Sequence, residues 1–303
     1  MAVMNISLRG AHDGEILHLS GAEAANEGIE LAKGGVDGFY EAPVETIWER
    51  ARRQRGGTFR GIEHPERDMT LAFHVMNMPG VAWQESAALL RNSLSYHLDP
   101  WWADDNLATL QVETDDDYRE LAVQMSEEPE LDPDHDPDVN GYAKMIVSLK
   151  AAQPFWQGKT AVSTWEASGS SGSGTVTVSN PTDVPMYLLW VLDPGTWTIP
   201  DVSWTGRPGK RTPGGEYANR SITLNPVTTT MGGLVIDTDP MERTFSDAAG
   251  TNVVGAVGGG YYIINREVPP RTPKTQLPVS VTGAAAGAGV ELHQVRLWGG
   301  VWS

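Results

Sequence analysis

The second half of the chain, from about residue 155 onward, constrains the fold most, because it alternates short strand-like runs with turn-forming segments. The runs are residues 160–165, 175–179, 186–192, 221–224, 233–237, 261–264, 278–281 and 291–298. Between them lie segments such as SGSSGSG, TGRPGKRTPGG, GAVGGG and GAAAGAG. Many short strands joined by Gly, Pro and Ser turns, without a helical period, predict an antiparallel β-sandwich with a domain boundary near residue 155.

One stretch of this half, SNPTDVPMYLLWVL at residues 179–192, shows the pattern most clearly. Asn180 and Asp183 are residues that satisfy backbone donors within turns, and the prolines at 181 and 185 fix φ. The seven uncharged residues 186–192 that follow predict a strand covered on both faces. By this reading Trp190 belongs to a core.

The first half combines strand-like runs with one helical pattern. Trp83, Ala87, Leu90 and Leu94 follow a spacing of i, i+4, i+7 and i+11, which predicts a helix over about residues 81–95. Strand patterns at 68–76, 107–112, 118–125 and 142–149 surround it. We therefore expect a mainly β protein: an N-terminal β domain over 1–155 with one α-helix, and a C-terminal β-sandwich over 156–303.

The chain contains no cysteine, which excludes disulfides, zinc-thiolate sites and cysteine nucleophiles together. Its fold must therefore depend on packing or on assembly. The first residues lack the pattern of a signal peptide, and no apolar run approaches the roughly 20 residues that span a bilayer. We expect synthesis and folding in a cytoplasm, without membrane insertion.

The formal net charge is −17, which disfavours general nucleic-acid binding because a phosphate-tracking surface needs clustered Lys and Arg. Much of the imbalance lies between residues 113 and 138, where only Arg119 opposes the acids. The acids are Glu113, Asp115, Asp116, Asp117, Glu120, Glu127, Glu128, Glu130, Asp132, Asp134, Asp136 and Asp138. Residues 126–140 are expected to form an acidic loop.

Part of this loop has the spacing of a metal site. Asp136, Asp138, Asn140 and Gly141 match the first half of a calcium loop. However, Val147 stands where the bidentate Glu belongs, and no helical pattern flanks the segment. A solvated acidic loop that meets a basic partner is the favoured interpretation, and neither a metal nor a cofactor is expected.

Five arginines surround Gly56 and Gly57, namely Arg50, Arg52, Arg53, Arg55 and Arg60. A solvated loop is the simplest interpretation. A sharper alternative is a contact between subunits, in which these guanidinium groups meet an acidic stretch of a neighbour that includes Asp115, Asp116 and Asp117. Binding of nucleic acid is the least favoured of the three interpretations.

Motifs of catalysis are absent from the sequence. The seven histidines form no H-E-x-x-H, there is no G-x-S-x-G, and Gln153 stands where a phosphate-binding loop ending at Gly158-Lys159-Thr160 needs glycine. Carboxylates are plentiful, but no pair is singled out as a glycosidase site. The chain is therefore not expected to be an enzyme, and no catalytic residue is assigned.

Several segments, taken in order, resemble the distal tail protein (Dit) family of long-tailed bacteriophages, in the minor tail protein form found in phages of actinobacteria. They are GGTFRG at 56–61, MTLAFHV at 69–75, the helix around Trp83, the strand pair with its acidic loop, NGYAKMIVSLKAAQPFWQG at 140–158, SNPTDVP at 179–185, GGLVIDTD at 232–239 and the terminal LWGGVWS. The resemblance covers nearly the whole chain and rests on the order and spacing of these segments.

The resemblance implies a structural virion protein with an N-terminal ring-forming domain and a C-terminal galectin-like sandwich. The implied homo-oligomer is a ring, usually of six copies, at the distal end of the virion tail. It implies contacts with the tail tube protein, the tail hub or tip protein and the tape measure protein, with DNA only in transit. Pro154, Phe155 and Trp156 are placed at the domain junction, and Arg60 in the loop before the ring-forming strand.

Two other functions remain open at this point. A carbohydrate- or receptor-binding tail module could use the C-terminal sandwich and bind host cell-wall glycan through surface tryptophans. The candidates are Trp190, Trp197, Trp204, Trp298 and Trp302, although burial is the simpler expectation for most of them. A peptidoglycan-cleaving tail component would need a catalytic carboxylate that the sequence does not single out.

Overall fold

The computed structural model of the chain describes residues 4–12, 14–102, 106–114, 117–132, 136–257 and 267–303. The chain folds as two compact units. Unit 1 comprises residues 1–158 together with 298–303, and unit 2 comprises residues 159–297. The sequence had placed the boundary near residue 155 and all later residues in the second domain. The structure instead returns the last six residues to unit 1.

Unit 1 is built on one large antiparallel sheet, which contains ten strands among the described residues. Its main path runs β2-β1-β7-β8-β10-β6-β3, with β9 beside β10 and β11 beside both β8 and β23. The strands are β1 (Ile6–Arg9), β2 (Ile16–Ser20), β3 (Ile29–Asp37), β6 (Arg67–Met76), β7 (Ala108–Glu113), β8 (Tyr118–Met125), β9 (Glu130–Asp132), β10 (Tyr142–Ala151), β11 (Trp156–Gln157) and β23 (Leu297–Trp298).

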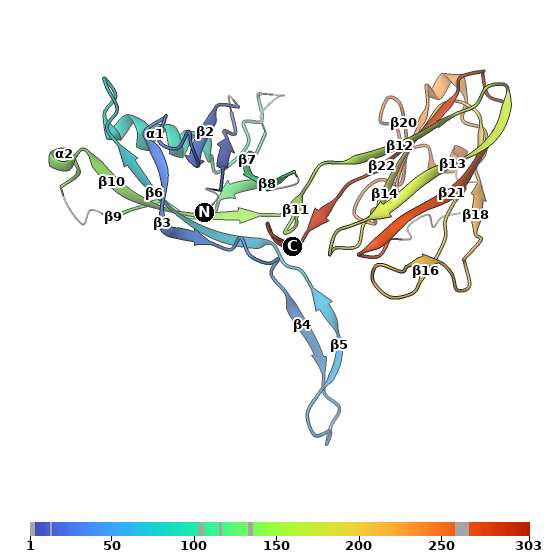
Figure 1. Ribbon diagram of the computed structural model, residues 1–303, viewed down its shortest axis with the longest axis horizontal. Coiled ribbons are helices and arrows are strands. Elements are labelled where there is room, and N and C mark those ends of the chain that lie inside the picture. The colour runs from blue at the N-terminus through green and yellow to red at the C-terminus, as the bar shows by residue number, and fades with distance from the viewer. Residues whose placement is uncertain (1–3, 13, 103–105, 115–116, 133–135, 258–266) are drawn as a thin grey trace. The chain divides into compact units, whose positions relative to one another are not determined.

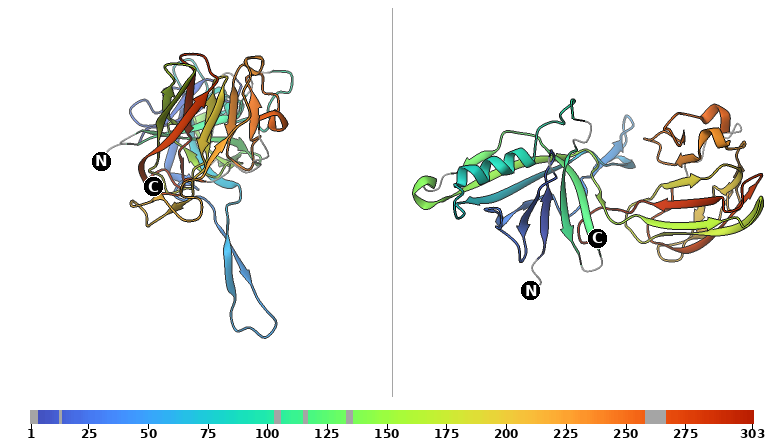
Figure 2. Two further views of the ribbon diagram at one scale, coloured as in Figure 1. Left: turned by 90° about the vertical axis from the view of Figure 1, so that its right-hand side faces the viewer. Right: turned by 90° about the horizontal axis from the view of Figure 1, so that it is seen from above.

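Alternation of apolar and polar residues fixes the register of the central strands. In β10 every second residue is buried, and Val147 and Leu149 lie opposite Leu71 and Met69 of β6. A one-residue slip would turn this apolar set to solvent, so the pairing is strongly specified. The helix expected over 81–95 is observed as α1 (Trp83–Ser93), which packs on the inner face of the sheet through Leu90 and neighbouring residues (Figure 2).

A buried guanidinium joins four segments of unit 1. Arg67, at the start of β6, is 1% exposed and carries no ion pair among the described residues. Its Nε donates to the carbonyl oxygen of Pro154 at 2.7 Å, Nη1 to that of Gly38 at 2.7 Å and Nη2 to that of Gly299 at 2.6 Å. Burial lowers the pKa of Arg67 to about 10, so the side chain stays charged at neutral pH.

The C-terminal residues pack into unit 1 around this arginine. The guanidinium carbon of Arg119 lies 4.0 Å from the ring centroid of Trp298, and Val301 is buried in the core of unit 1. Gly300 lies so close to Tyr40 that a Cβ there would stand 1.7 Å from the Tyr40 carbonyl oxygen. Only glycine fits this approach, which explains the second glycine of LWGGVWS.

Unit 2 is a β-sandwich of two antiparallel sheets (Figure 2). One sheet has the order β12-β22-β14-β19-β20, and the other β13-β21-β15-β18. Trp190 of the first sheet and Trp197 of the second belong to one buried core. The strands are β12 (Ala161–Glu166), β13 (Ser171–Asn180), β14 (Leu188–Leu192), β15 (Thr196–Pro200), β18 (Ser221–Thr223), β19 (Leu234–Asp237), β20 (Phe245–Asp247), β21 (Thr272–Thr282) and β22 (Gly289–Gln294), with a small hairpin of β16 (Trp204–Thr205) and β17 (Thr212–Pro213).

Short helical turns complete the two units. Unit 2 contains a 3-10 turn, η1 (Thr229–Met231), and the helix α3 (Val254–Val257). In unit 1 the segment 126–140, expected as a loop, contains β9 and the helix α2 (Pro137–Asn140). The strand expected at 261–264 lies outside the described residues.

The mainly β class predicted from the sequence is confirmed by the strands of both units. The segment SGSSGSG, expected as a turn between strands, is one only in residues 168–170, because β13 begins at Ser171 and Gly174 packs beneath Trp165.

Replacing Arg67 with Met keeps much of the side-chain volume but removes all three hydrogen bonds. We expect Arg67→Met to lower the free energy of unfolding of unit 1 by about 3 kcal/mol, because three carbonyls, one of a buried and two of half-buried residues, lose a charged donor. Denaturant titration followed by tryptophan fluorescence measures this. The matched control is Arg9→Met, which removes an exposed pair with Glu120 and should cost less than about 1 kcal/mol. Equal losses in the two variants would contradict the role assigned to Arg67.

Candidate functional site

A hairpin of β4 (Glu45–Glu49) and β5 (Thr58–Glu63) extends away from the main sheet of unit 1 (Figure 1). Its two strands pair only with each other. Every residue of β4 is exposed, and so is every residue of β5 except the half-buried Gly61. An isolated two-stranded hairpin is marginally stable in water, so this element has too few contacts of its own to hold it firmly.

Large apolar side chains lie on the hairpin in contact with solvent. Trp48 and Phe59 face each other across the strands, with ring centroids 5.5 Å apart, and their exposed fractions are 57% and 51%. Ile47 and Ile62 are exposed as well. An exposed apolar patch of this kind on a projecting element is typical of a surface that binds another protein.

The five predicted arginines all lie on this hairpin. Arg60, which the family resemblance had placed in a loop, is instead part of β5 and forms an ion pair with Glu49. Arg50, Arg52, Arg53 and Arg55 occupy the turn between the strands, are exposed, and make no ion pair within the described part of the chain. The arrangement places four guanidinium groups at the end of the hairpin, beyond the Trp48–Phe59 pair.

The acidic half of the predicted contact is only partly described. Asp115 and Asp116 lie outside the described residues, whereas Asp117 closes the turn between β7 and β8 through its carbonyl oxygen and the Thr114 amide, 2.7 Å apart. No contact joins the hairpin arginines to Asp117 in the residues that the structure describes. A meeting between these groups therefore stays a prediction about neighbouring copies.

A groove of about 840 Å³ runs beside α1 on unit 1. Met125 and Met145 at its base are almost completely buried, while Tyr96 and Leu131 on its walls are exposed. The other lining residues are His12, Trp83, Gln84, Ala87, Arg91, Asn92, Ser95, His97, Glu128 and Pro129. Sequence patterns did not reveal this groove, because its residues come from four separate segments that only the sheet brings together.

Acidic side chains border the groove. Glu128 lines it, and Glu130, two residues further along the chain, is exposed. Asp138 accepts hydrogen bonds from Trp83 Nε1 at 3.0 Å and Gln84 Nε2 at 2.8 Å, which places its carboxylate at the end of the groove. Because Arg91 is the only cation among the lining residues, the border carries mainly negative charge.

The calcium-loop residues have local structural roles. Asp136 caps α2 by accepting from the Asp138 amide at 3.0 Å, and Asn140 donates to the Asp136 carbonyl oxygen at 3.0 Å. Asp138 is engaged with α1, as described above. Among the described residues no group of three or more His, Asp or Glu side chains is placed to hold a metal ion.

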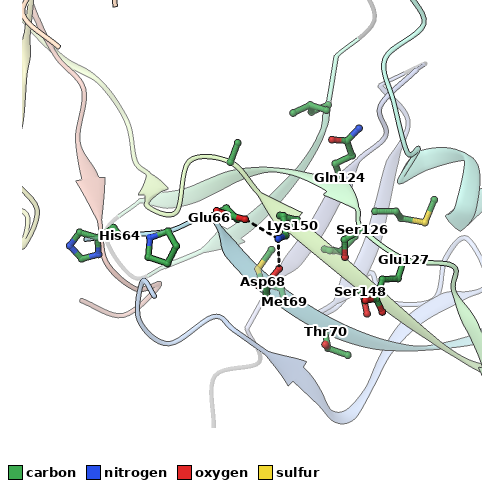
Figure 3. A pocket seen from close by; sticks show the side chains of 15 residues that line it. His64, Glu66, Asp68, Met69, Thr70, Gln124, Ser126, Glu127, Ser148 and Lys150 are labelled. Atoms are coloured by element: carbon green, nitrogen blue, oxygen red, sulfur yellow. Dashed lines mark hydrogen bonds and ion pairs between the residues drawn. The ribbon is translucent and has the colours of Figure 1, made fainter. Parts of the chain in front are cut away.

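A second hollow of about 1070 Å³ lies on the other side of β6 and β10 (Figure 3). Lys150 lies between Glu66 and Asp68, at 3.1 Å and 3.3 Å. The pKa of Lys150 is raised, mainly by its hydrogen bond to Glu66 and to a smaller extent by its hydrogen bond to Asp68. The pKa of Glu66 is lowered, mainly by a backbone hydrogen bond and to a smaller extent by its hydrogen bond with Lys150. Each group is thereby held in its charged form, which suits a solvated ion-pair cluster rather than proton transfer at neutral pH.

The predicted junction residues lie at the end of unit 1. Trp156 is fully buried in the core of unit 1, and the Phe155 ring packs against His64 at a centroid distance of 4.9 Å. Pro154 accepts from Arg67, as described above. The first of the two segments of unit 1 ends at Gly158, two residues beyond Trp156.

The tryptophans offer no broad platform for sugars on unit 2. Trp190 and Trp197 are buried, and Trp204 is half-buried. Trp298 is half-buried, whereas Trp302 is 58% exposed, and both belong to unit 1. No tryptophan of unit 2, all of which the structure describes, is exposed.

Taken together, these features define a β protein whose most distinctive surfaces are suited to contacts with other proteins. The hairpin presents aromatic and cationic groups, and the groove presents an apolar base with an acidic border. No helix among the described residues is long and apolar enough to cross a membrane.

Comparison with known proteins agrees with that class. No protein-family model matches the chain. The chain is 24% identical to minor tail protein Gp27 of Mycobacterium phage D29 and 23% identical to minor tail protein Gp27 of Mycobacterium phage L5. Each alignment covers 91% of this chain and 93% of the relative.

The fold resembles the crystal structure of the SPP1 Dit (gp 19.1) protein, described as a paradigm of the hub adsorption apparatus in phages that infect Gram-positive bacteria. The TM-score is 0.57 at 11% sequence identity, over 95% of this chain and 98% of that protein. Over nearly its whole length the chain is thus similar to minor tail proteins of mycobacteriophages, and its fold is similar to that of a Dit protein. The names of both relatives describe tail proteins and no enzymatic activity.

Limited digestion with trypsin should cut the isolated chain first after Arg50, Arg52, Arg53 or Arg55, because the hairpin opens locally at low free-energy cost. Time-resolved mass spectrometry of the fragments identifies the first cut. The matched control is Lys210 and Arg211 in the β16–β17 hairpin, whose turn is held by a 2.7 Å hydrogen bond from the Gly209 amide to the Arg271 carbonyl oxygen. Faster cleavage at those residues would contradict the assigned weakness of β4–β5.

Proposed function

We propose that this structural tail protein is an adaptor that forms a closed ring at the distal end of the virion tail. The ring, of six copies, joins the tail tube to the tail hub or tip protein and leaves a channel for the tape measure protein and DNA. The observation that carries the proposal is the projecting β4–β5 hairpin, whose exposed aromatic residues and four unpaired arginines require a partner. Synthesis in the host cytoplasm precedes incorporation into the tail.

The contact between copies is heterologous in this proposal, since the hairpin and the surface that receives it are different parts of unit 1. Repetition of one heterologous contact produces a closed ring when the rotation between neighbours closes. Separate patches of opposite charge on one chain support such a head-to-tail arrangement. The arginine turn supplies the positive patch, and the acidic segments of unit 1 supply the negative one.

The charge of the chain suits a channel through which DNA passes. Most of the 39 acidic residues lie in unit 1, the proposed ring-forming unit. A negative wall repels the phosphate backbone, and DNA in transit is then not retained. Unit 2, the proposed galectin-like sandwich, takes contacts with neighbouring tail proteins. A glycan partner stays a prediction from sequence, because the tryptophans of unit 2 are buried or half-buried.

Mass photometry of the purified chain across a concentration series tests the ring. We expect hexamers at high concentration, and we expect Arg52→Glu with Arg53→Glu to weaken self-association by about 100-fold, since each reversal replaces an attraction with a repulsion. Added tail tube protein should stabilise the wild-type ring.

The control variant carries Arg207→Glu with Lys210→Glu, which reverses two exposed cations in a loop of unit 2. It changes the net charge of the chain by the same amount, but it should assemble like the wild type. A wild-type chain that stays monomeric at every concentration, with and without tube protein, would overturn the proposal.

A further inference from the structure

Resting on the proposed ring, we propose that the β4–β5 hairpin of one copy docks into the groove beside α1 of the next copy. The groove is an open concave surface of unit 1 with an apolar base, and the hairpin is a projecting element of the same unit with exposed apolar residues. Each surface lacks a partner of its own within the described chain, and the two are complementary in both hydrophobicity and charge.

The apolar match involves aromatic side chains on both surfaces. Trp48 and Phe59 form a compact pair at an edge-to-face interplanar angle of 66°. The base of the groove is made of Met125 and Met145, whose flexible thioether side chains accommodate aromatic rings well. Tyr96 on the groove wall supplies a further ring, and large aromatic residues of this kind dominate the energetics of protein interfaces.

The charge match follows from the order of residues along the hairpin. Arg50, Arg52, Arg53 and Arg55 lie in the turn beyond the aromatic pair, with no carboxylate among residues 50–60. When the aromatic pair occupies the base of the groove, the turn reaches the acidic border formed by Glu128, Glu130 and Asp138. Guanidinium groups bind carboxylates in a bidentate manner, which adds geometric specificity to the attraction.

Two further tryptophans extend the receiving surface. After α1 the chain turns at Asp99, whose carboxylate accepts from the Trp101 amide at 2.9 Å. The turn leaves Trp101 92% exposed and Trp102 45% exposed. Trp102 stacks near His12, one of the groove residues, with ring centroids 6.4 Å apart. An exposed aromatic pair at this end of the groove is available to cover the hairpin once it has docked.

Cross-linking between copies tests the docking directly, because the natural chain has no cysteine. The full chain carrying Ala51→Cys in the hairpin and Asn92→Cys in the groove keeps every charge of the proposed contact. A short bismaleimide should link the two thiols between copies and produce a ladder of oligomers on a denaturing gel, up to the size of the ring. The matched control pairs Asn92→Cys with Ala249→Cys, an exposed turn residue of unit 2, and should yield no ladder.

Native mass photometry of the same samples separates the two proposals. Rings without a ladder from Ala51→Cys and Asn92→Cys would overturn the docking site while leaving the ring intact. Monomers alone would overturn the ring itself. A ladder from the Ala249→Cys control as strong as from the test pair would show collision rather than docking, and would also overturn the proposal.

A charge exchange provides the second test. Arg52→Glu with Arg53→Glu should weaken self-association, and adding Glu128→Lys with Glu130→Lys should restore it by at least about tenfold relative to the arginine variant alone. Recovery measured by mass photometry supports the pairing of these two surfaces. No recovery, with all variants retaining the wild-type circular dichroism spectrum, would contradict it.

Discussion

The buried guanidinium of Arg67 is the interaction on which unit 1 depends. A charge removed from water is costly unless its donors are satisfied, and here three backbone carbonyls from separate parts of the chain satisfy them. No carboxylate among the described residues neutralises the charge, so the site gains its stability from hydrogen-bond geometry, with the Trp156 ring 5.8 Å away. Loss of any one carbonyl would leave a donor buried and unpaired. The loop at Gly38, the segment at Pro154 and the C-terminal residues are therefore held in place together.

The buried core of unit 1 contrasts with the exposed β4–β5 hairpin. The sheet, α1 and the C-terminal residues share one buried core, whereas the hairpin leaves Trp48 and Phe59 in water. A chain that forms only monomers would gain from replacing these residues with polar ones. Their presence makes sense if burial occurs in an assembly, where an interface supplies the apolar contacts that the monomer lacks.

The sequence alone predicted the features that depend on local patterns. Alternation of apolar and polar residues predicted β6 and β10, and the helical spacing of apolar residues from Trp83 to Leu94 predicted α1. Turn-forming residues indicated where the strands of unit 2 begin and end. It did not predict features that depend on distant contacts. Arg67 looks like any surface arginine, and Gly174 looks flexible although it packs beneath Trp165. The β4–β5 hairpin had a readable signal, two strand-like runs around Gly56-Gly57, but the arginines between them favoured a loop.

Charge distribution also bears on the order in which an assembly forms. Unit 1 carries an excess of acidic residues, so two copies of it repel each other as they approach. Salt at physiological ionic strength screens this repulsion at separations beyond about 8 Å. Only an approach that brings the arginine turn towards an acidic surface turns this repulsion into attraction. In the proposed ring, the same acidic excess penalises wrong orientations, and one orientation is favoured before any apolar contact forms. In the proposed ring, burial of Trp48 and Phe59 then holds neighbouring copies together, since exposed charges alone contribute little to lasting affinity.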